Sequence, residues 1–175
     1  TVFIPLCGES LDIDWLADNG YHIIGNEIIE KPVQSLLDRR SVPYQIRERT
    51  NFTLYHTNNI SIWNGDFFNL PTEALPAIDA IYDRGSLVAL PPEKRKHYAR
   101  RMTELASVHT QMLLITYRYD QTEMDGPPYS ISHDEIESYY GNQFKIDHLF
   151  NKPLPDQLNK FESKGLSTFL DLNVY

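Results

Sequence analysis

The sequence predicts an α/β protein with a doubly wound, largely parallel sheet that is covered by helices on both faces. Apolar strand segments alternate with helical segments along the first two thirds of the chain. The first strand runs straight into a small-residue turn at Gly8, and the second strand, 21–26, delivers a carboxylate, Glu27. A strand, a glycine turn, a helix and a strand ending in a carboxylate form the nucleotide-binding half of such a sheet.

The remaining segments follow the same alternation. Apolar spacing predicts a first helix that ends at Asn19-Gly20, with Leu11, Trp15 and Leu16 facing the core. Proline in the first turn indicates a second helix from Glu30. Further strands are expected at 60–63, 77–82 and 111–117, with a helix over 92–106 and an ambiguous polar stretch at 41–58 that contains a possible short strand, 52–55.

The last third of the chain has a different character. A turn-rich loop at 119–128 precedes a short helix, 132–140. Two further strands are expected at 144–150 and 167–174, joined by a helical segment, 157–164. Strands joined in this way are typical of an antiparallel edge pair.

Bulk properties restrict the classes of function. A chain of 175 residues with 41% hydrophobic residues is expected to form one domain over 1–175. Its formal net charge of -8 argues against a nucleic-acid partner. The densest basic cluster, 94–96 with Arg100 and Arg101, lies in a helical pattern and is interpreted as a solvated helix face.

Features that the sequence lacks restrict the classes of function further. One cysteine, Cys7, excludes an internal disulfide and a multi-thiolate zinc site, and it is compatible with the reducing cytoplasm, where we expect the protein. Dispersed histidines predict no metal site, and no apolar run is long enough for a membrane span. The sequence starts in a core strand without methionine, so we expect that a leading segment is missing.

The candidate ligand site lies at the strand ends, because an open parallel sheet binds its ligand beyond the carboxyl ends of its strands. These ends can hold a ribose between the first two strands and an adenine between the second and third. The residues at the successive strand ends are Leu6, Cys7, Gly8, Glu27, Asp66, Phe67, Asp83, Arg84, Tyr119 and Asp120.

The residues of the turn at Gly8 favour a nucleoside ligand without phosphates. A dinucleotide fingerprint needs three glycines and a P-loop needs a lysine, whereas here Gly8 is followed by Glu9. A carboxylate at that place repels pyrophosphate, which disfavours NAD, FAD and ATP and with them a dinucleotide-dependent oxidoreductase. S-adenosylmethionine is the common ligand with adenine and ribose but no phosphate.

Each residue also has a purely structural interpretation. In this interpretation, Gly8 forms the strand-to-helix turn and has no ligand, and Glu27 is a solvated strand-end carboxylate. Asp66 can cap the helical turn after it. Arg84 can pair with Asp83 or Glu27. Cys7 can be a small buried hydrophobe rather than a nucleophile.

Several segments resemble the thiopurine S-methyltransferase family, most closely its bacterial branch. The match covers essentially the whole chain in the right order. It is carried by Val2-Phe3-Ile4-Pro5-Leu6-Cys7-Gly8, Ser10-Leu11-Asp12, Trp15-Leu16-Ala17, Gly65-Asp66-Phe67-Phe68, Tyr82-Asp83-Arg84-Gly85-Ser86-Leu87-Val88-Ala89-Leu90-Pro91, Tyr119-Asp120 and Glu123-Met124-Asp125-Gly126-Pro127-Pro128.

The resemblance implies a Rossmann-like methyltransferase sheet of seven strands, mostly parallel, with an antiparallel last strand. It also implies S-adenosylmethionine as cofactor and S-adenosylhomocysteine as product. The family's cofactor contacts correspond to Leu6, Glu27, Asp66, Phe67 and Arg84, to which the turn chemistry adds Gly8. Family substrates are aromatic and heterocyclic thiols, and bacterial members resemble enzymes that methylate selenium or tellurium compounds.

Within this interpretation, Arg84 is expected to stabilise an anionic thiol or selenol acceptor, because a guanidinium stays charged. Asp83 either orients Arg84, accepts a proton or has a structural role. Tyr119, Asp120 and the loop 124–128 are expected to border the acceptor pocket of a monomeric enzyme.

The sequence departs from the family at three places. The family has lysine at the position of Glu9 and a small apolar residue at that of Asn26. The family's N-terminal segment, which closes over cofactor and substrate, has no counterpart here. A cofactor-binding but catalytically degenerate protein is therefore the alternative function.

Overall fold

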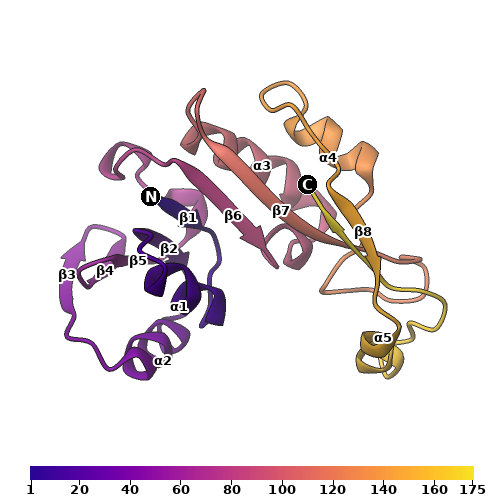
Figure 1. The fold of residues 1–175 in the computed structure, drawn as a ribbon, viewed down its shortest axis with the longest axis horizontal. Helices are drawn as coiled ribbons and strands as arrows, with labels where there is room; N and C mark the ends of the chain where they lie inside the picture. The colour runs from indigo at the N-terminus through magenta and orange to yellow at the C-terminus, as the bar shows by residue number, and fades with distance from the viewer. The chain divides into compact units, whose positions relative to one another are not determined.

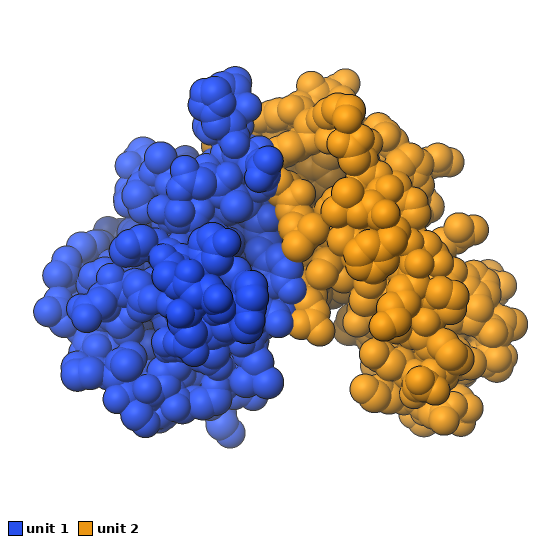
Figure 2. Space-filling view, in the orientation of Figure 1, with its two compact units in different colours: residues 1–82, 105–111 blue, residues 83–104, 112–175 orange.

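The computed structural model describes residues 1–175. Contacts divide the chain into two compact units (Figure 2). Unit 1 comprises residues 1–82 and 105–111, and unit 2 comprises residues 83–104 and 112–175. None of the helices is both long enough and apolar enough to cross a membrane.

Unit 1 carries the nucleotide-binding topology that the sequence predicts. Its strands follow the order β3-β4-β5-β2-β1-β6, and the pairs β1–β2, β2–β5 and β1–β6 are parallel (Figure 1). The strand order reverses at β1, where doubly wound sheets bind their ligands. The elements are β1 (Val2–Ile4), α1 (Leu11–Asp18), β2 (Ile23–Glu27), α2 (Glu30–Arg40), β3 (Gln45–Arg49), β4 (Phe52–His56), β5 (Ile60–Asn64) and β6 (Ala80–Arg84), whose last two residues belong to unit 2.

An antiparallel hairpin, β3–β4, extends the parallel strands of unit 1 beyond β5. The sequence predicts β4 as a short extra strand, but β3 falls in the stretch treated as ambiguous. All five residues of β3 are exposed, so its sequence lacks the apolar alternation that marks a half-buried strand. The structure therefore has nine strands, and the count of seven is not confirmed.

The core-facing side of α1 differs from the prediction. Trp15 is 63% exposed and Leu11 is 68% exposed, whereas Ile13 and Ala17 are buried. The prediction that Trp15 and Leu11 belong to the core is therefore wrong. Ile13 joins the buried cluster that contains Ile23 of β2.

Unit 2 contains the predicted antiparallel strands. β7 (Gln111–Arg118), whose first residue belongs to unit 1, pairs antiparallel with β9 (Asp171–Val174), and β9 pairs antiparallel with β8 (Phe150–Pro153). The last strand is thus antiparallel, as predicted, but β8 begins only where the predicted 144–150 strand ends. Phe144 instead packs edge-on against Tyr140, 6.2 Å between ring centroids.

The helices of unit 2 are α3 (Pro92–Leu105), whose last residue belongs to unit 1, α4 (His133–Tyr140) and α5 (Pro155–Glu162). The basic cluster on α3 is only partly a solvated face. Lys94, Lys96 and Arg100 are exposed, whereas Arg95 is buried and ion-paired with Glu135. The prediction of a solvated face is therefore wrong for Arg95.

Candidate active site

The turn after β1 contains two residues with positive φ, Leu6 at 42° and Gly8 at 52°. Glycine adopts this conformation freely, whereas a leucine there costs roughly 1–2 kcal/mol. The backbone amide of Cys7 donates to the carbonyl of Asn26 at 2.8 Å, which continues the pairing of β1 with β2 past the end of β1. Ser10 then caps α1 by accepting from the amide of Asp12. The turn brings the amide of Gly8 to the end of β2.

Glu27 is held in place by two backbone amides. Its Oε2 accepts from the amide of Gly8 at 2.9 Å, and its Oε1 accepts from the amide of Ile29 at 2.8 Å. The residue is 8% exposed. Each carboxylate oxygen can accept about two hydrogen bonds, so each retains one acceptor site for a further donor. The carboxylate is thus preorganised to accept from two neighbouring hydroxyl groups.

Asp66 and Phe67 follow β5. Asp66 Oδ1 accepts from the amide of Phe68 at 3.0 Å, so Asp66 caps the short helical turn η1 (Phe67–Asn69). Phe67 is buried, with its ring 6.4 Å from that of Phe3. The structural interpretation of Asp66 as a cap therefore holds, and its carboxylate keeps further acceptor capacity.

Asn26 fixes the approach to Asp66, a role that sequence reasoning missed. Its buried Nδ2 donates to the carbonyl oxygens of Trp63 at 2.8 Å and Gly65 at 3.0 Å. A small apolar residue cannot make these bonds. An asparagine inside an otherwise apolar strand was the available signal, because a buried amide requires partners.

Cys7 has the properties of a buried hydrophobe. Burial, with the neighbouring Glu27 carboxylate adding to it, raises the pKa of the Cys7 thiol to about 12. The thiol is therefore protonated at neutral pH and is a poor nucleophile.

The residues of unit 1 fit an adenosyl group. Ribose presents neighbouring hydroxyl donors, which match the two remaining acceptor sites of Glu27. A phosphate would instead meet the Glu27 carboxylate, and Glu9, next to Gly8 in the turn after β1, adds a second carboxylate. No group of three or more His, Cys, Asp or Glu side chains in the chain is placed to hold a metal ion.

Asp83 is fully buried and is held by donors of unit 2. It accepts from the hydroxyl of Tyr98 at 2.8 Å and from the amides of Ser86 at 3.2 Å and Leu87 at 3.3 Å. Burial raises the pKa of Asp83, and these hydrogen bonds oppose the rise. The exposed Arg84 starts the turn that these bonds close, in which Gly85 has φ of 97°. Sequence reasoning missed Tyr98, which lies in the middle of α3.

Tyr119 and Asp120 stabilise their own loop. The buried Tyr119 donates its hydroxyl to the carbonyl of Pro128 at 2.7 Å. The exposed Asp120 accepts from the amide and hydroxyl of Thr122 at 2.9 and 2.7 Å, which lowers the pKa of its carboxyl. Both residues thus define the path of the predicted acceptor loop.

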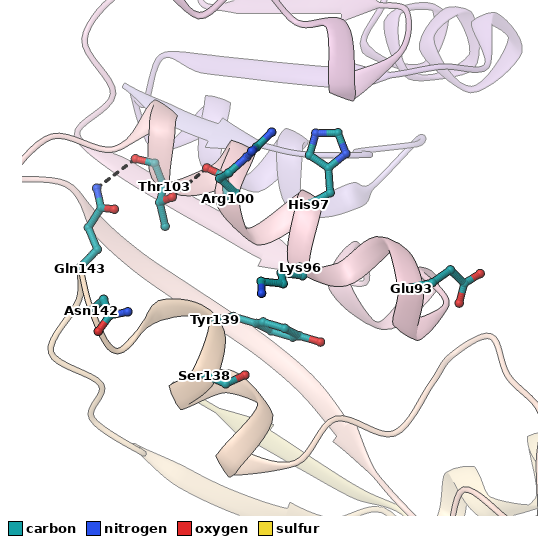
Figure 3. Close-up of a pocket in the computed structure, with 9 residues that line it drawn as sticks. All are labelled: Glu93, Lys96, His97, Arg100, Thr103, Ser138, Tyr139, Asn142 and Gln143. Carbon is teal, nitrogen blue, oxygen red and sulfur yellow. Dashed lines mark hydrogen bonds between the residues drawn. The ribbon is translucent and has the colours of Figure 1, made fainter.

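A groove of about 640 Å³ lies between α3 and α4 in unit 2 (Figure 3). None of the predicted site residues lines it. The lining residues are Glu93, Lys96, His97, Arg100, Thr103, Ser138, Tyr139, Asn142 and Gln143.

Solved structures share this fold. A protein of Bacillus subtilis, YcgJ, aligns with 99% of this chain and 88% of its own at a TM-score of 0.70 and 12% identity. A SAM-dependent methyltransferase of Anabaena variabilis aligns with 99% of this chain and 75% of its own at a TM-score of 0.64 and 15% identity. The fold and the sequence relatives together define an S-adenosylmethionine-dependent methyltransferase.

The sequence comparison is more specific. The model of the thiopurine S-methyltransferase family matches residues 1–175. The thiopurine S-methyltransferase of Teredinibacter turnerae is 43% identical over 152 residues, 87% of this chain and 71% of its own. That of Pseudomonas fluorescens SBW25 is 38% identical over 174 residues, 99% of this chain and 79% of its own. The chain belongs to the thiopurine S-methyltransferase family.

Proposed function

We propose that this chain transfers the methyl group of S-adenosylmethionine to the sulfur of an aromatic or heterocyclic thiol. The family match over the whole chain supports the reaction class. The observation that carries the cofactor assignment is the Glu27 carboxylate, fixed by the amides of Gly8 and Ile29 with one acceptor site left on each oxygen. Selenols and tellurium compounds are further candidate acceptors.

In this proposal Glu27 accepts hydrogen bonds from the two ribose hydroxyls. Asp66 and Phe67, after β5, hold the adenine, with Asn26 fixing the backbone that leads into them. The backbone at Leu6 and Gly8 lies along the cofactor, where positive φ directs the chain around it. The family resemblance adds Arg84, the last residue of β6, as a further cofactor contact in this proposal.

The cofactor, when bound, supplies a methyl group on a positively charged sulfur that leaves as a neutral thioether. The thiolate sulfur donates an electron pair to the methyl carbon while the bond from that carbon to the sulfonium breaks. No acid is needed for the leaving group. Catalysis by this chain then depends on alignment and the exclusion of water, effects worth up to about 7–11 kcal/mol.

We assign Arg84 to the anionic acceptor, directly or through a water molecule. Of the roles predicted for Asp83, its bonds to Tyr98 and to the amides of Ser86 and Leu87 support holding the turn that carries Arg84 over accepting a proton. Tyr119 and Asp120, on the loop after β7, are the proposed border of the acceptor site. We further propose a cytoplasmic monomer whose residues 1–175 act as one catalytic domain.

The test is a methylation assay with S-adenosylmethionine and matched acceptors, read by mass spectrometry of the product. We expect S-methylation of 6-mercaptopurine and 4-nitrothiophenol, and none of their oxygen analogues hypoxanthine and 4-nitrophenol. Binding of S-adenosylhomocysteine without methylation of any thiol or selenol would support the cofactor-binding, degenerate alternative, which the methyltransferase names of the relatives do not favour.

A further inference from the structure

A buried guanidinium on α3 connects two segments of unit 2 that carry proposed acceptor residues. Arg95 is 3% exposed. Its Nε donates to the carbonyl of Leu90 at 2.9 Å, and its Nη1 donates to Glu135 Oε1 at 2.6 Å. Arg95 thus fixes the end of the segment 84–91, which begins with Arg84, and ties it to α4.

The same guanidinium contacts the second segment through an aromatic ring. Its Cζ lies 5.2 Å from the ring centroid of Tyr129, within the range of a cation–π interaction. The amide of Tyr129 donates to the carbonyl of Val88 at 2.6 Å, which joins the two segments directly. Tyr129 lies in the segment 119–130, which contains Tyr119 and Asp120.

The partner carboxylate is itself fixed. Glu135 Oε1 accepts from the hydroxyl of Tyr139 at 2.8 Å in addition to Arg95. The Glu135 amide is capped by Ser132, so the carboxylate projects from the ordered first turn of α4. The ion pair is therefore anchored at both ends.

We infer that Arg95 is a positioning residue for methyl transfer, which holds the segments 84–91 and 119–130 in the arrangement that receives the acceptor. The inference rests on the proposed function. An arginine suits this role because its planar fork donates from Nε and Nη1 at once while its face covers a ring. A lysine keeps the charge but offers one ammonium, which cannot reproduce the three contacts.

The test compares Arg95→Lys with Arg100→Lys in the full chain. Arg100 lies on the same helix, its side chain is 69% exposed, and it lines the groove in Figure 3. The control therefore makes the same chemical change away from the contacts of Arg95 with the segments 84–91 and 119–130. We measure kcat and KM for 6-mercaptopurine, KM for S-adenosylmethionine and the Kd of S-adenosylhomocysteine, all well below each variant's Tm.

For Arg95→Lys we expect kcat/KM for the thiol to fall at least tenfold, while the Kd of S-adenosylhomocysteine stays within threefold of wild type. Arg100→Lys should stay within twofold in every parameter. A thiol kcat/KM within threefold of wild type overturns the inference. An equal loss of thiol turnover and cofactor affinity also overturns it, because that pattern indicates a general structural role.

A second variant keeps the test decisive if Arg95→Lys does not fold. Tyr129→Leu removes the ring but leaves the Arg95–Glu135 ion pair intact. We expect the same split, in which kcat/KM for the thiol falls while the Kd of S-adenosylhomocysteine stays close to that of wild type. Absence of that split contradicts the inference. A wild-type chain that methylates no thiol would instead overturn the proposed function on which the inference rests.

Discussion

Replacing Glu27 with glutamine tests the cofactor site with a change of a few atoms. In the wild-type protein both carboxylate oxygens accept backbone hydrogen bonds, from Gly8 at 2.9 Å and from Ile29 at 2.8 Å. A glutamine side chain has one oxygen and one NH2 group. Whichever way the amide is turned, its NH2 faces one backbone N–H, and a ribose hydroxyl on that side loses its charged acceptor.

The expected loss of ligand affinity follows from the hydrogen bond to the ribose that is removed. A hydrogen bond to a charged group contributes about 1.5–3 kcal/mol. At about 1.36 kcal/mol for each tenfold change, losing one such bond to the ribose weakens binding by about 10- to 150-fold. The one backbone amide that loses its acceptor, that of Gly8 or that of Ile29, belongs to a residue that is not buried, so most of the loss should appear in ligand affinity rather than in folding.

Isothermal titration calorimetry with S-adenosylhomocysteine measures this loss. Glu9→Gln is the matched control, because it removes the same charge from an exposed side chain next to Gly8, whose amide Glu27 binds. We expect the Kd to rise at least tenfold for Glu27→Gln and to stay within threefold for Glu9→Gln. Equal Kd values for wild type and Glu27→Gln would refute the reasoning.

Three further predictions concern buried polar groups. Tyr98→Phe removes a donor from Asp83 and should lower the free energy of unfolding by about 1–3 kcal/mol. Because burial already raises the pKa of Asp83 above 3.8, stability from this group is full below that pH and is lost as pH rises through the folded-state pKa. Because the Tyr98 hydroxyl opposes the rise in the pKa of Asp83, its removal should cost more above the folded-state pKa of Asp83 than below it; urea unfolding over a series of pH values measures this, and a loss that is the same at every pH would count against the argument. Cys7, with its pKa raised from 9.0 to about 12, should resist a thiol reagent at pH 8 until the protein is unfolded in urea. Rapid labelling of the native protein would contradict this expectation. Because the folded state keeps the thiol proton that the unfolded state releases, the free energy of unfolding should fall between pH 9 and about 12. Cys7→Ala should reduce that fall. Asn26→Leu leaves two carbonyl oxygens without their donor and should lower the free energy of unfolding by about 1–3 kcal/mol and weaken S-adenosylhomocysteine binding several-fold. Thermal unfolding and calorimetry identical to wild type would exclude that role.

The parallel strands were predictable because their apolar runs are continuous and each is followed by a turn. β2, which ends at Glu27, and β5, which is followed by Asp66, both follow from this signal. The hairpin strand β3 gives no such signal, because every residue in it is exposed. β8 is likewise exposed throughout, and the apolar Phe144 that indicated its start packs on α4 instead.

Helix faces were harder to predict than strands. α1 has only eight residues, and two of its apolar side chains, Leu11 and Trp15, lie on its exposed side. On α3, Arg95 stands in a run of basic residues that predicts a solvated face. Its burial depends on Glu135 and Tyr129, which are far along the chain. Local spacing carries no information about such distant partners, so the buried arginine could not be distinguished from its solvated neighbours.

Determining the structure with S-adenosylhomocysteine bound tests the central claim most directly. The account predicts that both ribose hydroxyls lie at hydrogen-bond distance, about 2.6–3.2 Å, from the Glu27 carboxylate oxygens, with the adenine beside Asp66. A bound ligand whose ribose makes no contact with Glu27 would contradict it.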